Sequence, residues 1–238
     1  MLKLFGCPRS AFRLTGLLVG LSTPVQAVES IVKNDSITGT TDATPCQCFI
    51  PGEIPASWLT VPADGTLVGV QVFWQSPFGG QPDSLEMAVN IYAGGTFPTP
   101  GAVLSSVPGP VLTDGMFNEF RFEDPPFDTV AINVPVTAGQ TIVVGLEIFN
   151  QSDGNTFAAS NSFDQDGCQA SRNTVFTSPG GWADACVLGV TGDWAIRAIV
   201  VPDNNIPAVS TWGLVVLSLL LLNAGVLTHT RSRPRPLA

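Results

Sequence analysis

The chain has 238 residues, 45% of them hydrophobic and 12% charged. Its acidic excess is concentrated in residues 28–201, where eighteen Asp and Glu stand against four Lys and Arg, a net charge of −14. Such a surface repels phosphate backbones, which argues against nucleic acid as a partner and is typical of a solvated acidic coat. The one histidine, His229, lies in the tail, so residues 28–201 cannot form a histidine-dependent protease triad or a histidine-ligated zinc site.

The amino terminus has the features of a secretory signal. Basic residues precede an apolar stretch at residues 14–21, and Val25 and Ala27 supply the small side chains that signal peptidase needs. We therefore expect signal peptidase to remove residues 1–27, with cleavage after Ala27. A lipoprotein signal at Cys7 is disfavoured, because no apolar segment precedes this cysteine.

Residues 28–201 have the alternating pattern of antiparallel strands. They show no sustained helical periodicity and no internal repeat, and turns rich in glycine and proline separate the apolar segments. Residues 28–65 are expected to be irregular, with one edge strand. The strands expected after them are residues 66–75, 85–93, 103–104, 117–123, 128–134, 140–150, 157–160, 174–177 and 193–201. The pattern predicts an all-β ectodomain, an antiparallel β-sandwich of jelly-roll type.

Side-chain alternation also predicts which residues face the core. Within residues 85–93, the apolar set that begins with Leu85 and Met87 is expected to point inward, and Glu86 is expected to face solvent. The turn at residues 137–140 is expected to join its two flanking strands as a hairpin.

Four cysteines remain after signal cleavage: Cys46, Cys48, Cys168 and Cys186. An even number of cysteines in an exported domain favours disulfides. The preferred bridge joins Cys168 to Cys186, which leaves Cys46 and Cys48 to close a small, strained ring. Crossed pairing between the two sets avoids this strain and remains an alternative. A four-cysteine zinc site is disfavoured by the single residue between Cys46 and Cys48 and by the oxidising compartment.

The loop at residues 164–167 is the candidate metal site. Asp164 and Asp166 offer carboxylate oxygens on a loop, which is the chemistry that calcium prefers, although the spacing is not that of an EF-hand. Further oxygen donors lie close in sequence, at Asp153, Asn155 and Asn161. The alternative is ordinary turn formation by Asp and Asn without a metal. Structural calcium is thus the one cofactor that the sequence suggests.

Trp182 is the candidate for stacking on a glycan, because it lies in a turn rich in glycine and proline. The alternative is that it plugs the end of the sandwich. Trp74 and Trp194 fall on the apolar registers of strands and are expected in the core. A glycosidase needs two carboxylates across a cleft, whereas the candidate glutamates fall on solvent-facing registers. We therefore expect no catalytic residue and no enzymatic activity.

A short polar linker, residues 202–205, leads to the last part of the chain, residues 206–238. The apolar segment at residues 212–228 has about the minimum length of a membrane-spanning helix. Three arginines follow it, at Arg231, Arg233 and Arg235. Since basic residues hold the cytoplasmic end of such a helix, the body is expected outside the cytoplasmic membrane.

The start of this tail carries a specific motif, formed by Ile206, Pro207, Trp212 and Gly213. Followed by an apolar helix and arginines, it resembles the IPTL-CTERM sorting signal, a relative of the PEP-CTERM tails of exported proteins of Gram-negative bacteria. The resemblance implies recognition by an exosortase-type membrane transpeptidase, which cuts near the motif and passes the protein to the outer surface or the extracellular matrix. It covers residues 206–238 only, and Ala208 and Val209 depart from the Thr-Leu of the family name.

Taken together, these features predict a non-enzymatic cell-surface or matrix protein that is exported by the Sec route and sorted through its tail. The expected partners are signal peptidase, an exosortase-type transpeptidase and, transiently, the inner membrane. One alternative is a carbohydrate-binding module for a surface polysaccharide, with or without calcium. A secreted glycoside-active enzyme is the other.

Overall fold

The computed structural model describes residues 28–39, 42–46, 49–76, 83–124, 130–149 and 160–203. These residues form an all-β body without an α-helix. Within these ranges there is no helix with the length and apolar character needed to cross a membrane. The predicted signal segment and the predicted spanning helix at residues 212–228 both lie outside the described residues.

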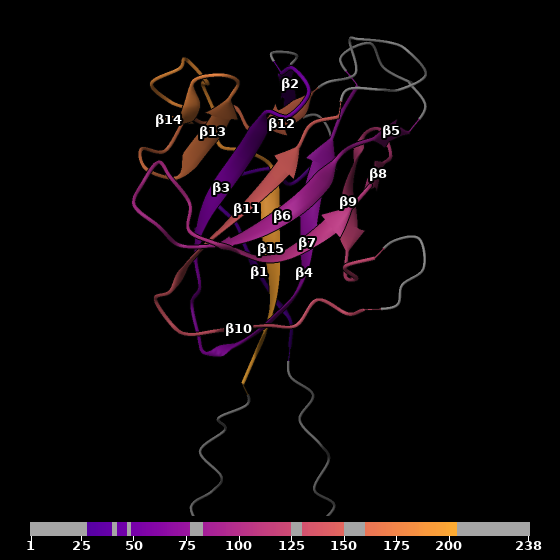
Figure 1. Ribbon diagram of the computed structural model, residues 1–238, viewed down its shortest axis with the longest axis vertical. Helices are drawn as coiled ribbons and strands as arrows, with labels where there is room; N and C mark the ends of the chain where they lie inside the picture. Colours follow the sequence, from indigo (N-terminus) through magenta and orange to yellow (C-terminus); the bar gives the residue numbers. More distant parts are fainter. Residues whose placement is uncertain are drawn as a thin grey trace, which may run out of the picture.

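Two antiparallel sheets make up most of the body (Figure 1). The five-stranded sheet has the order β1 (Ser30–Val32), β15 (Ile196–Pro202), β4 (Gly65–Trp74) and β10 (Val134–Val136), and β9 (Met116–Phe120) also pairs with β4. The six-stranded sheet has the order β14 (Gly181–Asp184), β13 (Asn173–Thr177), β3 (Ile54–Thr60), β11 (Thr141–Glu147), β6 (Ala88–Ala93) and β7 (Val103–Pro108). Two ribbons complete the body: β2 (Thr44–Cys46) with β12 (Asn161–Phe163), and β5 (Ser84–Leu85) with β8 (Val111–Leu112).

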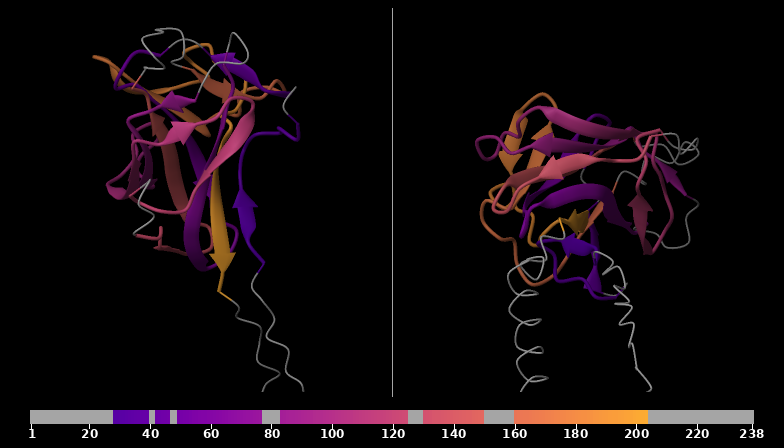
Figure 2. Two further views of the ribbon diagram at one scale, coloured as in Figure 1. Left: turned by 90° about the vertical axis from the view of Figure 1, so that its right-hand side faces the viewer. Right: turned by 90° about the horizontal axis from the view of Figure 1, so that it is seen from below.

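The two sheets lie as two layers with the main apolar core between them (Figure 2). On β11 the predicted alternation is confirmed, because Ile142, Val144 and Leu146 are fully buried on the core side. The facing sheet contributes Ile196 and Ala198 from β15, which are also fully buried. Burial of each large side chain of this kind stabilises the fold by about 1.5–3 kcal/mol.

Strand β15 is buried on both faces. Its second face carries Arg197, which donates from Nε and Nη2 to the two carboxylate oxygens of Asp35 and from Nη2 to the carbonyl of Ile37. The guanidinium also lies 3.7 Å from the centre of the Phe117 ring. The ion pair thus holds the chain that follows β1 against the outer face of the five-stranded sheet.

Both ends of the body lie at one end of the sandwich (Figure 1). Ser30 is opposite Val200 in the β1–β15 pair, and Pro202 is opposite Gly65. We call this end, marked by Ser30, Gly65 and Pro202, the terminal pole. The other end, where β4 finishes and the chain enters β15, is the distal pole.

The prediction for residues 85–93 was wrong at its start. The chain forms two strands there, β5 and β6, and Glu86 lies buried between them. Its carboxylate accepts hydrogen bonds from the Ser84 hydroxyl at 2.6 Å and the Phe149 N–H at 2.7 Å. Because these donors satisfy Glu86 inside the body, Leu85 and Met87 point outward, each 44% exposed.

The expected hairpin at residues 137–140 was also wrong. The turn forms, since the Gln140 N–H donates to the carbonyl of Thr137 at 3.0 Å. However, β10 pairs with β4, whereas β11 pairs with β3 and β6. The turn therefore carries the chain from one sheet to the other.

Strand β3 lies in the region that was expected to be irregular. It pairs with β13 on one side and β11 on the other, and six of its seven residues are buried. Since Ala56 and Trp58 pack on the outer face and Ser57 and Leu59 are buried on the core side, the strand shows no alternation of apolar and polar residues.

The buried ion pair generates a stability prediction. Arg197→Met leaves the fully buried Asp35 carboxylate with only the partly exposed Lys33, at 4.0 Å, as a cation, so we expect a loss of about 3–5 kcal/mol in the free energy of unfolding. Arg121→Met is the matched control, because it breaks exposed ion pairs with Glu29 and Glu119 and should cost less than about 1 kcal/mol. Urea denaturation measures both, and equal losses would contradict the assigned role of Arg197.

Candidate functional site

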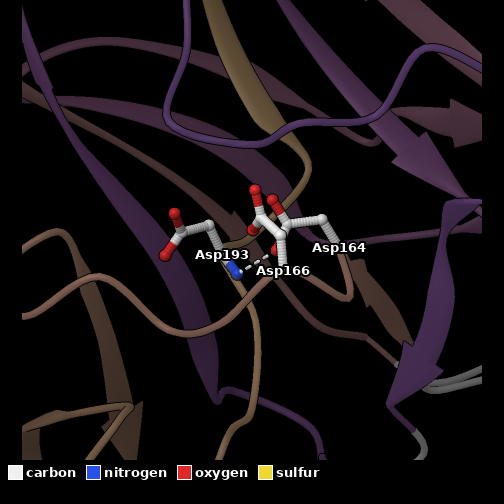
Figure 3. Close-up of side chains that lie close together, drawn as sticks. All are labelled: Asp164, Asp166 and Asp193. Carbon is white, nitrogen blue, oxygen red and sulfur yellow. Dashed lines mark hydrogen bonds between the residues drawn. The ribbon is translucent and has the colours of Figure 1, made fainter.

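The candidate site is an acidic cluster at the distal pole. Asp164 follows β12, Asp193 precedes β15, and Phe163 and Trp194 form an antiparallel bridge that places these segments side by side. One carboxylate oxygen from each of Asp164, Asp166 and Asp193 lies within 4.8 Å of the other two. Figure 3 shows the carboxylates of Asp164 and Asp166 next to each other and the carboxylate of Asp193 set apart from this pair.

A glycine permits the close approach of the two segments. A Cβ atom on Gly192 would lie 1.9 Å from the backbone oxygen of Asp164, which is far inside van der Waals contact. Without a side chain at this position, the Asp164 N–H can donate to the carbonyl of Asp193 at 3.0 Å. Gly192 is therefore a structural requirement of the site.

The carboxylate of Asp164 is fully buried and accepts three hydrogen bonds. Its Oδ2 accepts from the N–H and the hydroxyl of Ser36 at 2.7 and 3.1 Å, and its Oδ1 accepts from the N–H of Asp193 at 2.7 Å. These bonds join the chain after β1, the chain after β12 and the chain before β15 at one side chain.

The carboxylate of Asp193 is also fully buried, but only one of its oxygens is hydrogen-bonded. Oδ1 accepts from the N–H of Gln169 at 2.7 Å and from the side-chain amide of Asn173. Oδ2 is buried and has no hydrogen-bond partner among the described residues. The carbonyl oxygen of the Asn173 side chain accepts from the Trp194 N–H at 3.0 Å, which extends the network into the core.

Burial changes the protonation of both carboxylates. It raises the pKa of Asp164 above its ordinary value of 3.8, and the adjacent carboxylate of Asp166 raises it further, while backbone hydrogen bonds from Asp193 and Ser36 lower it. Burial likewise raises the pKa of Asp193, against hydrogen bonds from Gln169 and Asn173. The fold thus holds two carboxylates where their charged forms are disfavoured.

Asp166 gives the cluster its solvent-accessible side. Its side chain is exposed, in contrast to Asp164 and Asp193. Gly167, which follows it, has a φ of +117°, in the region that glycine adopts without strain. The turn therefore brings an exposed carboxylate back beside a buried one.

A disulfide closes the loop next to the cluster. The predicted bridge between Cys168 and Cys186 is present, across a sequence separation of 18 residues. A loop of this size corresponds to about 3 kcal/mol of stabilisation in the chain-entropy account. Cys46 is also in a disulfide, so both the crossed pairing and the four-cysteine zinc site are excluded. Cys48 lies outside the described residues.

The sequence predicts a turn at Trp182, but this residue lies on the edge strand β14. It is partly buried and makes edge-to-face contacts with Tyr92 and Phe176, with ring centroids 5.9 and 5.4 Å apart. This aromatic cluster covers the outer face of the six-stranded sheet, where Phe97 packs on Trp58. The tryptophans predicted in the core, Trp74 and Trp194, are fully buried.

Two pockets formed by described residues each contain one glutamate. A pocket of about 190 Å³ is lined by Phe49, Glu53, Val175, Thr177, Leu188, Val190 and Trp194. Glu53 accepts hydrogen bonds from the N–H groups of Ile50 and Ser178. The second pocket contains Glu86, which accepts hydrogen bonds from the Ser84 hydroxyl and the Phe149 N–H. Among the described residues that line them, each pocket thus has one carboxylate and not the pair that glycoside hydrolysis requires.

Several predicted site residues lie outside the described residues: Ala27, Cys48, Asp153, Asn155, Ile206, Pro207, Trp212, Gly213, Arg231, Arg233 and Arg235. Of the metal candidates, the structure brings Asp164 and Asp166 together. The sequence does not identify Asp193 as a metal candidate, because this residue begins the periodic apolar segment that predicts a strand. The pairing of Phe163 with Trp194 and the hydrogen bonds between Asp164 and Asp193 make the two residues neighbours in the folded chain.

Comparison of the chain with protein-family models, with curated proteins and with solved structures finds no match.

The raised pKa values predict that the stability of the folded chain, measured in the presence of a chelator, depends on pH. The folded chain binds these protons more tightly than the unfolded chain, so the contribution to stability is present below about pH 3.8 and is lost as the pH rises through the raised pKa values. Asp193→Asn keeps the oxygen that accepts two hydrogen bonds and removes the charge. We expect it to flatten the fall of the melting temperature between mildly acidic and neutral pH.

Asp83→Asn is the control for this measurement, since Asp83 is exposed and is not one of the clustered carboxylates. It should leave the pH profile of the melting temperature as in the wild type. If Asp193→Asn also leaves the profile unchanged, the buried carboxylate does not carry the pH dependence.

Proposed function

We propose that this jelly-roll-like β-sandwich is a non-enzymatic surface or matrix protein, exported by the Sec route, held by its tail and presented with its distal pole outward. The observation that supports the proposal is the pairing of the first strand with the last. Because Ser30 and Pro202 both lie at the terminal pole, the predicted signal and the predicted sorting tail join the body at the same end.

This arrangement suits a protein that is handled through its two ends. Signal peptidase would cleave after Ala27, close before β1, and the motif that begins at Ile206 follows shortly after β15. A membrane-inserted tail would then lie below the terminal pole. The acidic cluster and the Cys168–Cys186 bridge, at the other end, would face away from the membrane.

Charge and cysteine chemistry favour the same location. The net charge of −14 over residues 28–201 disfavours contact of the body with anionic headgroups. Disulfides at Cys46 and between Cys168 and Cys186 are typical of proteins that fold in an oxidising compartment. Both properties suit a body that is displayed away from the membrane surface.

The sorting role has a direct test in fractionated cells. Replacing Pro207 and Trp212 by alanine should trap the precursor in the inner membrane, because the resemblance places both residues in the recognised motif. Val209→Ala is the matched control, since this position already departs from the pattern and should tolerate the change. Mass analysis of the protein in each fraction reports its termini. Wild-type localisation of the double variant would overturn the sorting proposal.

A further inference from the structure

The acidic cluster carries negative charge that no cation of the described residues offsets. The four Lys and Arg of the body have other partners: Lys33 and Arg197 contact Asp35, Arg121 contacts Glu29 and Glu119, and Arg172 contacts Thr60. Asp164, Asp166 and Asp193 thus share one corner of the molecule as three carboxylates. Two of them are fully buried, and buried carboxylates without a counter-charge are costly.

An independent observation points to a missing partner. The Oδ2 atom of Asp193 is buried and receives no hydrogen bond from the described residues, although Oδ1 of the same carboxylate receives two. Buried polar atoms in folded proteins are nearly always satisfied by protein, water or an ion. Since a carboxylate oxygen can only accept, the partner of Oδ2 is either a donor or a cation.

The geometry favours a cation. Carboxylate oxygens from Asp164, Asp166 and Asp193 lie within 4.8 Å of one another, and calcium binds oxygens at about 2.3–2.6 Å. An ion between these three side chains would therefore lie near coordination distance of one oxygen from each of them. The exposed side chain of Asp166 leaves a path from solvent, through which waters can complete the coordination shell.

We propose that Asp164, Asp166 and Asp193 bind a calcium ion at the distal pole. The donors are all hard oxygens, which suits calcium rather than zinc or copper, and a mixed set of buried and exposed carboxylates suits its flexible coordination better than the strict octahedron of magnesium. The inference rests on the body alone and holds whatever the tail does.

Such an ion would have a structural consequence. Asp164 holds the Ser36 segment through its Oδ2 atom, and Asp193 holds the Gln169 segment through its Oδ1 atom. A calcium ion that joins the two carboxylates would tie the chain after β1 to the disulfide-closed loop. It would also hold Trp194 in place, because this residue follows Asp193 directly and its ring fills the distal end of the core.

Terbium luminescence and thermal unfolding test the proposal on the full chain with its disulfides intact. Terbium replaces calcium in oxygen sites, and Trp194 is close enough to sensitise its emission. We expect tryptophan-sensitised emission that calcium displaces, a rise in melting temperature on adding calcium, and a calcium Kd of about 0.1–1 mM, as in extracellular modules.

Variants separate a defined site from general attraction to an acidic surface. Asp166→Asn removes an exposed ligand without disturbing the core and should weaken calcium binding by roughly tenfold, since affinity follows the charge of the ligand set. Asp83→Asn, which removes an exposed charge that is not part of the cluster, should bind calcium as the wild type does. If the two variants behave alike, calcium binds only diffusely and the proposal is wrong.

Asp193→Asn supplies a second readout. In a chelator at neutral pH this variant should be at least as stable as the wild type, because a buried charge is gone, and calcium should no longer raise its melting temperature. If calcium also fails to raise the melting temperature of the wild type, a proton rather than a cation neutralises the cluster, and the calcium site is overturned.

Discussion

The pairing of β15 with β1 and β4 is the constraint on which the rest of the structure depends. This last strand of the body inserts between the first strand and β4, so the five-stranded sheet is incomplete until the chain reaches Pro202. One face of β15 supplies the core, and the other carries Arg197, which holds the chain after β1 through Asp35. Because β1 and β15 pair in antiparallel fashion, the two ends of the body also lie at the same pole.

The start of β15 also determines the character of the opposite pole. Asp193 and Trp194 lie side by side in sequence, one bonded into a polar network and the other at the end of the apolar core. Burying two carboxylates there is unfavourable by itself, and the backbone and side-chain donors around Asp164 compensate only part of the cost. The remaining cost of burying these two carboxylates distinguishes the distal pole from the exposed acidic residues of the body.

Local pattern was sufficient to locate the strands in which apolar residues recur at every second position. Strands β4 and β11 and the segment ending in β15 were predicted within a few residues, because apolar side chains at alternate positions face the main core. Strand β3 was missed, since it is buried on both faces and lacks the alternation. The inward position of Glu86 could not be predicted, because its donors, Ser84 and Phe149, come together only in the folded chain.

The sequence by itself determined the all-β class, the preferred Cys168–Cys186 bridge and the candidate pair Asp164 and Asp166, since periodicity, cysteine number and the spacing of acids are local properties. Only the tertiary structure decided that Asp193 joins that pair, that the chain at residues 137–140 changes sheets and that both ends of the body share one pole. These features depend on contacts between residues far apart in the chain. Strand pairing sets such contacts, and no local pattern encodes which strands pair.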